Sequence, residues 1–542
     1  MNRFLKKILT AVLCMSFALG LCTPLSVLAD EHAAVEISDR SLVTDSTGFP
    51  SISSFFDNNK ADGWKSEDVS SLTLHHEGGI GSLYLTFGRA PGTYTVRNDD
   101  TGICYTAGEQ GFVHEFLDLT AAFGSAPKSV TLFFETGAVY LYELDVFSPG
   151  AVPDTVQKWE TAPEGEVDLI LFAAHGGDDQ LFFAGLLPYY AVERNYEVLV
   201  VFMTDHLNTT PVRIHEVLNG LWASGIRNYP VFGPFKDFDD THTLDATVRS
   251  YLAYGWSMET MTGFVVEQLR RFKPMVAVGH DLNGEYSFGQ HMVYAQLVAD
   301  AVQLSADSSQ YPESAQAYGI WDVPKTYLHL YGANQTTLDL DQPMTAFGGL
   351  SPYQVSKTLG FTAHNSQYKN WSWFFSGKDK ATQFELTSPR CYGLYRSTVG
   401  ADLQKNDLFE NVISHARQEQ LDEAARQEEE RLKAEEEARK AAEEEAQRAE
   451  EEASIAAEEA AKQAEEAARL AEEEARREEE ARLAEEERLQ EEQEAMKRDE
   501  QQEKLIFIIL GIVGFIAVIG TVSAIYMKLT AGKFSKSKRR KK

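Results

Sequence analysis

Between residues 34 and 150, apolar and polar positions alternate in short runs that are separated by turn residues. The runs GSLYLTFG, GTYTVRN, SVTLFFETG and VYLYELDVF follow this pattern, and NDDTG between them is a strong turn signal. No long helical period occurs in this stretch. The pattern predicts a β-sandwich domain over residues 30–150.

From about residue 166 to 413, strand-like runs alternate with segments of helical length. The runs VDLILFAA, YEVLVVFMTD and PMVAVGHD are continuously apolar, which is typical of strands covered on both faces. The segments between them include QLFFAGLLPYYAVER, VRIHEVLNGLWASG and HMVYAQLVADAV. This alternation predicts an α/β domain with a mainly parallel sheet. Ligands of such folds bind beyond the carboxyl ends of the strands, so these ends are where chemistry is expected.

Residues 415–504 contain no Gly, Pro, Val or aromatic residue and consist largely of strong helix formers. Acidic and basic residues are closely spaced, as in Glu435 with Lys440 and Glu430 with Lys433. We expect one helix of about 90 residues, roughly 130 Å long at 1.5 Å per residue. Alanines with 3-4 spacing form a weak seam, which leaves open both a free-standing helix and a weakly self-associating coiled coil.

The two ends of the chain predict a membrane protein. Residues 1–29 read as a secretory signal peptide, with a charged start, an apolar stretch and a cut after Ala29. Residues 505–527 carry no charge and are long enough to cross a bilayer, and the basic segment 528–542 should stay cytoplasmic. The expected location is the cell membrane, with a single span and the N-terminal domains outside. The net charge of −32 argues against nucleic acid as a partner.

The stretch LILFAAHGGDDQLFFAG is the strongest candidate for a site. A strand delivers His175 to the sheet edge, two glycines let the chain bend around an ion, and Asp178 follows. One imidazole and one carboxylate suit zinc, which needs a third protein ligand. The segment GHDLNGEYSFGQHMV offers four candidates for it: His280, Asp281, Glu285 and His291. Alternatively, Asp178 or Asp179 only caps a helix; a dinucleotide loop is disfavoured because the chain has no G-x-G-x-x-G.

Two segments resemble the signatures of the PIG-L/LmbE-like deacetylases. LFAAHGGDDQLFFAGLLPYY is similar to a first signature, A-H-x-D-D-E, and GHDLNGEYSFGQH to a second, N-G-E-Y-G-H-x-x-H. RIHEVLNGLWASGIRNYPV, FTAHNSQ and YGLYRSTVGADLQKNDLFENV resemble other parts of the family, so the resemblance covers about residues 168–412. It implies a Rossmann-like α/β fold and zinc-dependent removal of acetyl groups from N-acetylglucosaminyl compounds.

Carried over by position, the resemblance makes His175, Asp178 and His291 the zinc ligands. The family's general base falls on Gly177 and its second catalytic histidine on Phe288, so neither proton-handling group is present. Asp179 stands in place of the final Glu of the first signature and is a candidate substitute base. A register shifted by one residue, with Asp178 as base and Asp179 as ligand, would turn the apolar LFFAG segment away from the core.

Other polar residues are candidates for binding the substrate. Arg213 and Glu216, one helical turn apart, could position a sugar or form a surface ion pair, and His280 and Glu285 are further candidates. For Trp371 and Trp373, core packing is the preferred interpretation over stacking on a sugar.

Together these observations predict a zinc-dependent N-deacetylase outside the cell, acting on N-acetylated amino sugars of glycans or glycolipids. The alternatives are a catalytically impaired zinc- and sugar-binding relative, and an adhesion module. The sandwich loosely resembles galactose-binding-like domains, which adds a second place where a sugar could bind.

Overall fold

The computed structural model describes residues 33–482, except 61–62, 67, 136, 210 and 239–240. The predicted signal peptide, the apolar segment 505–527, the basic tail and the last part of the charged helix lie outside these residues. Within the described part, no helix combines the length and the apolarity needed to cross a bilayer. The chain divides into two compact units, residues 1–424 and 425–542.

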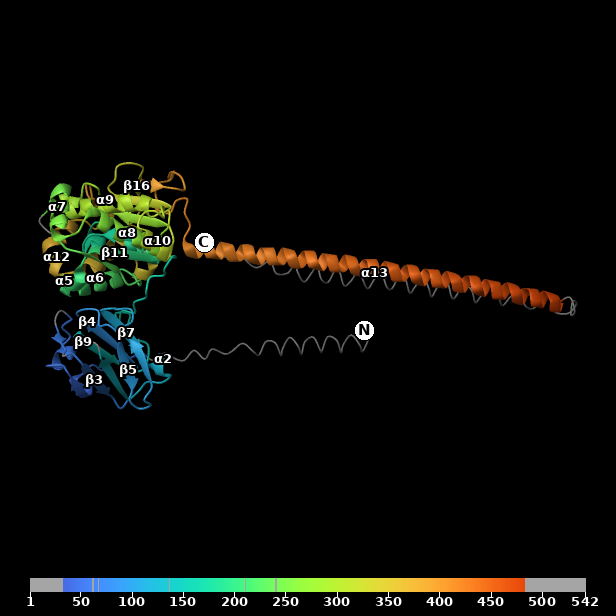
Figure 1. The fold of residues 1–542 in the computed structure, drawn as a ribbon, viewed down its shortest axis with the longest axis horizontal. Coiled ribbons are helices and arrows are strands. Elements are labelled where there is room, and N and C mark those ends of the chain that lie inside the picture. Colours follow the sequence, from blue (N-terminus) through green and yellow to red (C-terminus); the bar gives the residue numbers. More distant parts are fainter. Residues whose placement is uncertain are drawn as a thin grey trace. The chain divides into compact units, whose positions relative to one another are not determined.

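The N-terminal part of the first unit consists of two antiparallel sheets (Figure 1). Alternating residues of β3 are buried, and the side chains between the sheets form an apolar core. One sheet has the order β1-β3-β8-β5-β6: Val43–Thr47, Ser70–His75, Ser129–Phe134, Tyr94–Asn98 and Cys104–Ala107. The other has the order β2-β9-β4-β7: Trp64–Lys65, Tyr140–Phe147, Ser82–Phe87 and His114–Asp118. The short helices here are η1 Arg40–Leu42, η2 Ser53–Phe56 and α2 Leu119–Phe123.

The rest of the first unit is an α/β domain around one seven-stranded sheet. Five strands pair in parallel, and β16 runs antiparallel between β14 and the edge strand β15, a reversal that the apolar pattern does not reveal. The order is β12-β11-β10-β13-β14-β16-β15: Val231–Phe235, Val198–Thr204, Leu169–Ala173, Val276–Gly279, Lys325–His329, Cys391–Ser397 and Gln335–Thr337.

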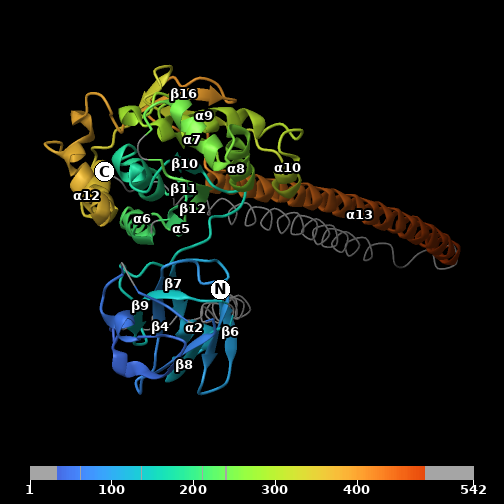
Figure 2. The ribbon, with the colours of Figure 1, turned by 60° about the vertical axis from the view of Figure 1, so that its left-hand side comes forward.

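Both faces of this sheet are covered, which explains its continuously apolar central strands. Leu171 of β10 belongs to the core on the side of α6 (Pro211–Ala223). Phe172 belongs to the opposite core, which includes residues of α8 (Met258–Phe272) and α9 (Gly289–Leu304). Figure 2 shows α6 on one side of β10 to β12 and α7 to α9 on the other.

The remaining helices of the domain are short. The segment predicted as one helix after β10 is broken into α3 (Asp178–Leu181), α4 (Leu186–Pro188) and a π-helical turn η3 (Tyr189–Glu193). The others are α5 His206–Thr209, α7 Leu244–Tyr254, η4 Glu285–Ser287, α10 Pro312–Tyr318, η5 Thr345–Phe347, α11 Pro352–Val355, η6 Ser356–Gly360, η7 Phe361–Ala363, α12 Asn365–Trp371, η8 Ser372–Phe375 and η9 Ala381–Gln383.

The sandwich and the α/β domain share buried contacts within the first unit. Phe112 stacks on Tyr229 with ring centroids 4.4 Å apart. His114 of β7 and His215 of α6 lie side by side, with Nε2 and Nδ1 2.8 Å apart. Because both imidazoles are buried, burial lowers the pKa of His215 to about 4, and the junction contains neutral rings.

The charged segment forms one helix, α13 (His415–Arg482), over its described length. Its ion pairs have i,i+4 spacing, and Lys440 pairs with Glu436 and Lys433 with Glu429, each one residue away from the partners read from the sequence. Since all these side chains are exposed, each pair stabilises the helix only slightly.

Candidate metal and sugar site

Three side chains from two parts of the chain converge on one point at the carboxyl end of β10. His175 follows the strand, Asp178 begins α3, and His291 lies in the first turn of α9. The distances are 3.1 Å from His175 Nδ1 to Asp178 Oδ2, 3.3 Å from that oxygen to His291 Nε2, and 3.4 Å between the two nitrogens. Tetrahedral zinc ligands at about 2.05 Å from the ion are about 3.3 Å apart. The three atoms therefore fit one zinc ion.

The two glycines between His175 and Asp178 allow this geometry. Gly177 has a φ of +107°, a conformation that residues with a side chain rarely adopt. A Cβ on Gly176 would lie 2.2 Å from Cγ2 of Val217 on α6, so the loop packs too closely for any side chain. Asp178 accepts the His175 N–H at 2.7 Å, which fixes its carboxylate beside the imidazole.

Each histidine ligand is oriented by a partner on its other ring nitrogen. His291 Nδ1 donates to Glu285 Oε2 at 2.8 Å, which leaves Nε2 for a metal. His175 Nε2 faces Gln290 Oε1 at 3.0 Å and Asp237 Oδ1 at 3.3 Å, which leaves Nδ1. Such partners fix the tautomer and the ring direction.

The surroundings of Asp178 keep this candidate metal ligand in its anionic form. Burial would raise the pKa of Asp178, but His291 and His175 beside it hold that pKa well below its usual range. The carboxylate is therefore ionised and ready to bind a cation.

Glu285 is the centre of a buried network behind the ligands. Besides His291, its carboxylate accepts from His280 Nδ1 at 2.8 Å and His329 Nδ1 at 2.6 Å, and it is 1% exposed. His280 Nε2 accepts the Ala174 N–H at 2.9 Å. His280, Glu285 and His291 also lie close enough together to hold an ion, but hydrogen bonds already use the atoms that would bind it. Glu285 and His280, expected in the substrate pocket, lie outside its wall.

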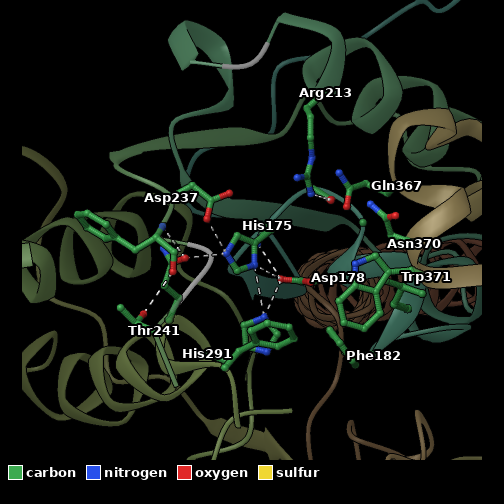
Figure 3. A pocket seen from close by; sticks show the side chains of 16 residues that line it. His175, Asp178, Phe182, Arg213, Asp237, Thr241, His291, Gln367, Asn370 and Trp371 are labelled. Atoms are coloured by element: carbon green, nitrogen blue, oxygen red, sulfur yellow. Dashed lines mark hydrogen bonds and ion pairs between the residues drawn. The ribbon is translucent and has the colours of Figure 1, made fainter. Parts of the chain in front are cut away.

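A cavity of about 330 Å³ opens beside the three ligands. In Figure 3, His175, Asp178 and His291 point toward one another, Asp237 lies across the His175 ring, and Arg213, Gln367, Asn370 and Trp371 lie on the Asp178 side. Arg213 is held by donating to the Gly176 carbonyl at 2.6 Å. The wall thus combines charged, amide and aromatic side chains. The lining residues are His175, Gly176, Gly177, Asp178, Leu181, Phe182, Arg213, Asp237, Phe238, Thr241, Phe288, Gln290, His291, Gln367, Asn370 and Trp371.

Two further candidates are placed away from the cavity. Glu216 accepts both the N–H and the hydroxyl of Ser366 at 2.6 Å, so it fixes the start of α12. Asp179 is fully buried and accepts from Gly177 N and Gln180 Nε2, and burial raises its pKa to about 7. Gly177 and Phe288 do line the cavity, but neither can carry a proton.

The sequence interpretation missed Asp237, Gln290 and the part played by α12. Asp237 follows β12, and the position of a carboxylate beyond a strand end was a usable signal. Trp371 packs against the apolar core, as preferred, and also lines the cavity, whereas Trp373 is 50% exposed and core packing was the wrong preference for it. His364 is fully buried, and neither of its ring nitrogens has a hydrogen-bond partner among the described residues.

Comparison with known proteins finds distant sequence similarity to deacetylases. A deacetylase of Catenulispora acidiphila, 1D-myo-inositol 2-acetamido-2-deoxy-alpha-D-glucopyranoside deacetylase 1, is 23% identical over 185 residues, covering 31% of this chain and 56% of that protein. The corresponding deacetylase of Streptomyces scabiei is 20% identical over 292 residues, covering 45% of this chain and 89% of that protein. The chain is a distant relative of sugar deacetylases. It spans only about half the length of the first of these relatives, and no protein-family model matches it.

Among solved structures, N,N′-diacetylchitobiose deacetylase from Pyrococcus horikoshii is 13% identical, with a TM-score of 0.29. The similarity covers 42% of this chain and 83% of that one.

Proposed function

We propose that the cavity binds zinc and an N-acetylated amino sugar of a glycan or glycolipid, and that it hydrolyses the acetamide at a reduced rate. The triangle of ligand atoms, with sides of 3.1, 3.3 and 3.4 Å, is the observation that carries this proposal. Two imidazoles and one carboxylate are a donor set typical of catalytic zinc, with a further position open for water or substrate. The similarity to deacetylases of acetamido sugars supports the choice of substrate.

When zinc is bound, it supplies a Lewis acid and lowers the pKa of bound water. The residues of this chain hold the ion and bind the sugar. Asp178 and the two histidines hold the ion, while Arg213 and Asp237 offer a donor and an acceptor to sugar hydroxyls. Trp371 presents an apolar face to the sugar ring, and the amides of Gln367 and Asn370 can bind its polar edge.

Proton transfer is the weak half of this site. A positioned acid or base contributes about 10²–10⁴-fold to such a reaction, and Gly177 and Phe288 supply none. Asp237 is the other carboxylate in the described wall, but it lies on the far side of the His175 ring from the ligand triangle. We therefore expect substrate binding to be retained and hydrolysis to be slow.

The second candidate function is sugar binding without turnover. The absence of a proton-carrying side chain at both Gly177 and Phe288 favours it. The two candidates share the zinc and the sugar and differ only in the release of an amine.

The experiment compares the full-length chain with two variants, Asp178→Asn and the exposed control Asp322→Asn. Zinc content is measured by mass spectrometry, binding of N-acetylglucosamine conjugates by calorimetry, and amine release by a fluorogenic reagent. Asp178→Asn should lose zinc and sugar binding, while Asp322→Asn retains both. Binding with slow release supports the deacetylase, binding without release supports the second candidate, and a zinc-free protein that binds no sugar refutes both.

We also propose that the first unit is displayed outside the cell. The apolar segment 505–527 and the basic tail support this topology. Protease added to intact cells should remove the first unit and leave a protected C-terminal fragment. If the first unit is protected until the cells are lysed, the topology is wrong.

A further inference from the structure

Aromatic side chains continue outward from the zinc cavity. At about 330 Å³ the cavity is near the lower end of ligand pockets, roughly 300–1,000 Å³, and suits a single sugar ring. Trp371 in its wall lies 5.7 Å from Phe288 and 5.6 Å from Trp373, measured between ring centroids. The aromatic surface that begins beside the candidate metal ligands therefore extends beyond the space that one sugar ring would fill.

The outer end of this surface is exposed. Trp373 is 50% exposed and Tyr286 is 44% exposed, and their ring centroids lie 5.5 Å apart at an interplanar angle of 84°. Tyr286 also lies 6.3 Å from Trp371, so the two exposed rings are continuous with the cavity wall. Large aromatic side chains usually bury most of their area, and an exposed group of them marks a binding surface.

The backbone holds Tyr286 in this position at a cost. Tyr286 and Ser287 have φ values of +53° and +61°, which are uncommon for residues with a side chain. Such conformations are typical of sites where function requires a particular side-chain direction. The same turn places Glu285 under the zinc ligands, so one short segment serves both the metal and the exposed ring.

We propose that Trp373 and Tyr286 form a second sugar subsite, so that the ligand is an oligosaccharide of N-acetylated amino sugars. This inference rests on the proposed function above. One ring of the oligosaccharide lies at the zinc, and the next lies against the indole of Trp373. A pyranose presents an apolar face of C–H groups to an aromatic ring and keeps its hydroxyls at the edge.

The chemistry of this surface favours a glycan over an acyl chain. Its exposed rings are Trp and Tyr, which combine an apolar face with a polar group. The Tyr286 hydroxyl lies 3.3 Å from Thr387 Oγ1, and Asn370 and Gln367 of α12 supply amides beside Trp371. An aliphatic ligand would gain nothing from these polar groups.

The test uses the full-length, zinc-loaded chain and titrates N-acetylglucosamine and its β-1,4-linked disaccharide and trisaccharide by calorimetry. We expect affinity to rise at least about tenfold from the monosaccharide to the disaccharide. Trp373→Ala should leave the affinity for the monosaccharide unchanged and reduce the affinity for the disaccharide to the same value. Trp373→Phe should restore part of the lost disaccharide affinity. Zinc content should be equal in all variants. Trp64→Ala, which removes a tryptophan of similar exposure (42%) from the sandwich, is the control.

The outcomes separate this inference from the proposed function. If the monosaccharide and the disaccharide bind equally, or Trp373→Ala changes neither, the second subsite is refuted while the zinc and sugar site stands. If no sugar binds to zinc-loaded protein, both fail. If Trp373→Ala abolishes binding to phosphatidylcholine vesicles and leaves the sugar affinities unchanged, the surface binds lipid and the glycan assignment is wrong.

Discussion

Replacement of Glu285 by Gln tests the network that orients His291. The carboxylate accepts hydrogen bonds from three imidazoles, at 2.8, 2.8 and 2.6 Å, and from the Asp281 N–H at 3.2 Å. Burial would raise the pKa of Glu285, but the hydrogen bonds that its carboxylate accepts hold that pKa well below its usual range. In the native site Glu285 is therefore an anion that acts only as an acceptor.

Glutamine has nearly the same shape but carries two N–H groups in place of one oxygen. Oε2 receives both His280 and His291, so an amide nitrogen there meets two N–H groups, while an amide turned the other way meets His329. Either way at least one N–H group, of an imidazole or of the Asp281 backbone, loses its acceptor inside the core. A hydrogen bond to a charged group contributes about 1.5–3 kcal/mol, and a buried donor left unpaired costs about 1–3 kcal/mol. We expect the free energy of unfolding of zinc-free protein to fall by about 3 kcal/mol.

The effect on the metal is estimated separately. Loss of the partner that orients a histidine ligand typically weakens metal affinity about 10–100-fold, which corresponds to about 1.4–2.7 kcal/mol. His291 loses its fixed tautomer, while His175 keeps Gln290 and Asp237. The zinc site should therefore survive at lower affinity.

Competition with a chromophoric chelator measures the zinc dissociation constant, and urea denaturation of zinc-free protein measures stability. The control is Glu143→Gln, which changes another buried carboxylate, 1% exposed, on β9 of the sandwich and should leave zinc affinity unchanged. If folded Glu285→Gln binds zinc within twofold of the native chain, Glu285 does not orient His291 in the way described here.

Two further predictions concern the domain junction and the missing acid and base. Because burial lowers the pKa of His215 from 6.5 to about 4, the unfolded chain binds a proton between these values that the folded chain does not. The free energy of unfolding should thus decrease as the pH is lowered from 6.5 to about 4. His215→Asn should reduce this slope by about 1.4 kcal/mol per pH unit in urea titrations, with His75→Asn as the control. Gly177→Asp combined with Phe288→His should raise amine release at least about 10²-fold. Because residue 177 has a φ of +107°, an aspartate there should lower the free energy of unfolding by about 1–3 kcal/mol. Unchanged amine release from folded, zinc-loaded protein would contradict this prediction.

The parallel core of the sheet could be predicted because β10, β11 and β13 are apolar throughout, as strands covered on both faces must be. The reversed direction of β16 could not be predicted, because it depends on the path of the chain and leaves no period in the sequence. The long helix after β10 was predicted too simply. Gly185 adopts a φ of +91° there, and the chain turns between α3 and α4.

His175 and Asp178 could be proposed as ligands from the residues alone because both follow a strand end, whereas His291 was one of four candidates for the third ligand and was selected by the family resemblance. The roles of the other acidic residues could not be read from the sequence. Glu216, Glu285 and Asp179 each occur beside a signature, but their directions depend on local turns. The turn at Tyr286 sends Glu285 beneath the histidines, and the N–H of Gly177 draws Asp179 inward. The spacing of residues along the chain does not determine whether a carboxylate in a loop points into the cavity or into the core.

These placements bear on what the site is organised to do. A fully buried carboxylate with three imidazoles around it is expensive to form, and it stabilises a fold only when every hydrogen bond is made. Here the network meets that condition, and one of its imidazoles presents Nε2 to the ligand triangle. In the described cavity wall, the positions of Gly177 and Phe288 carry no proton-transfer group that such a network could support. The buried charges are thus organised around three side chains suited to hold a metal beside the cavity, so variants of this network should weaken ligand binding.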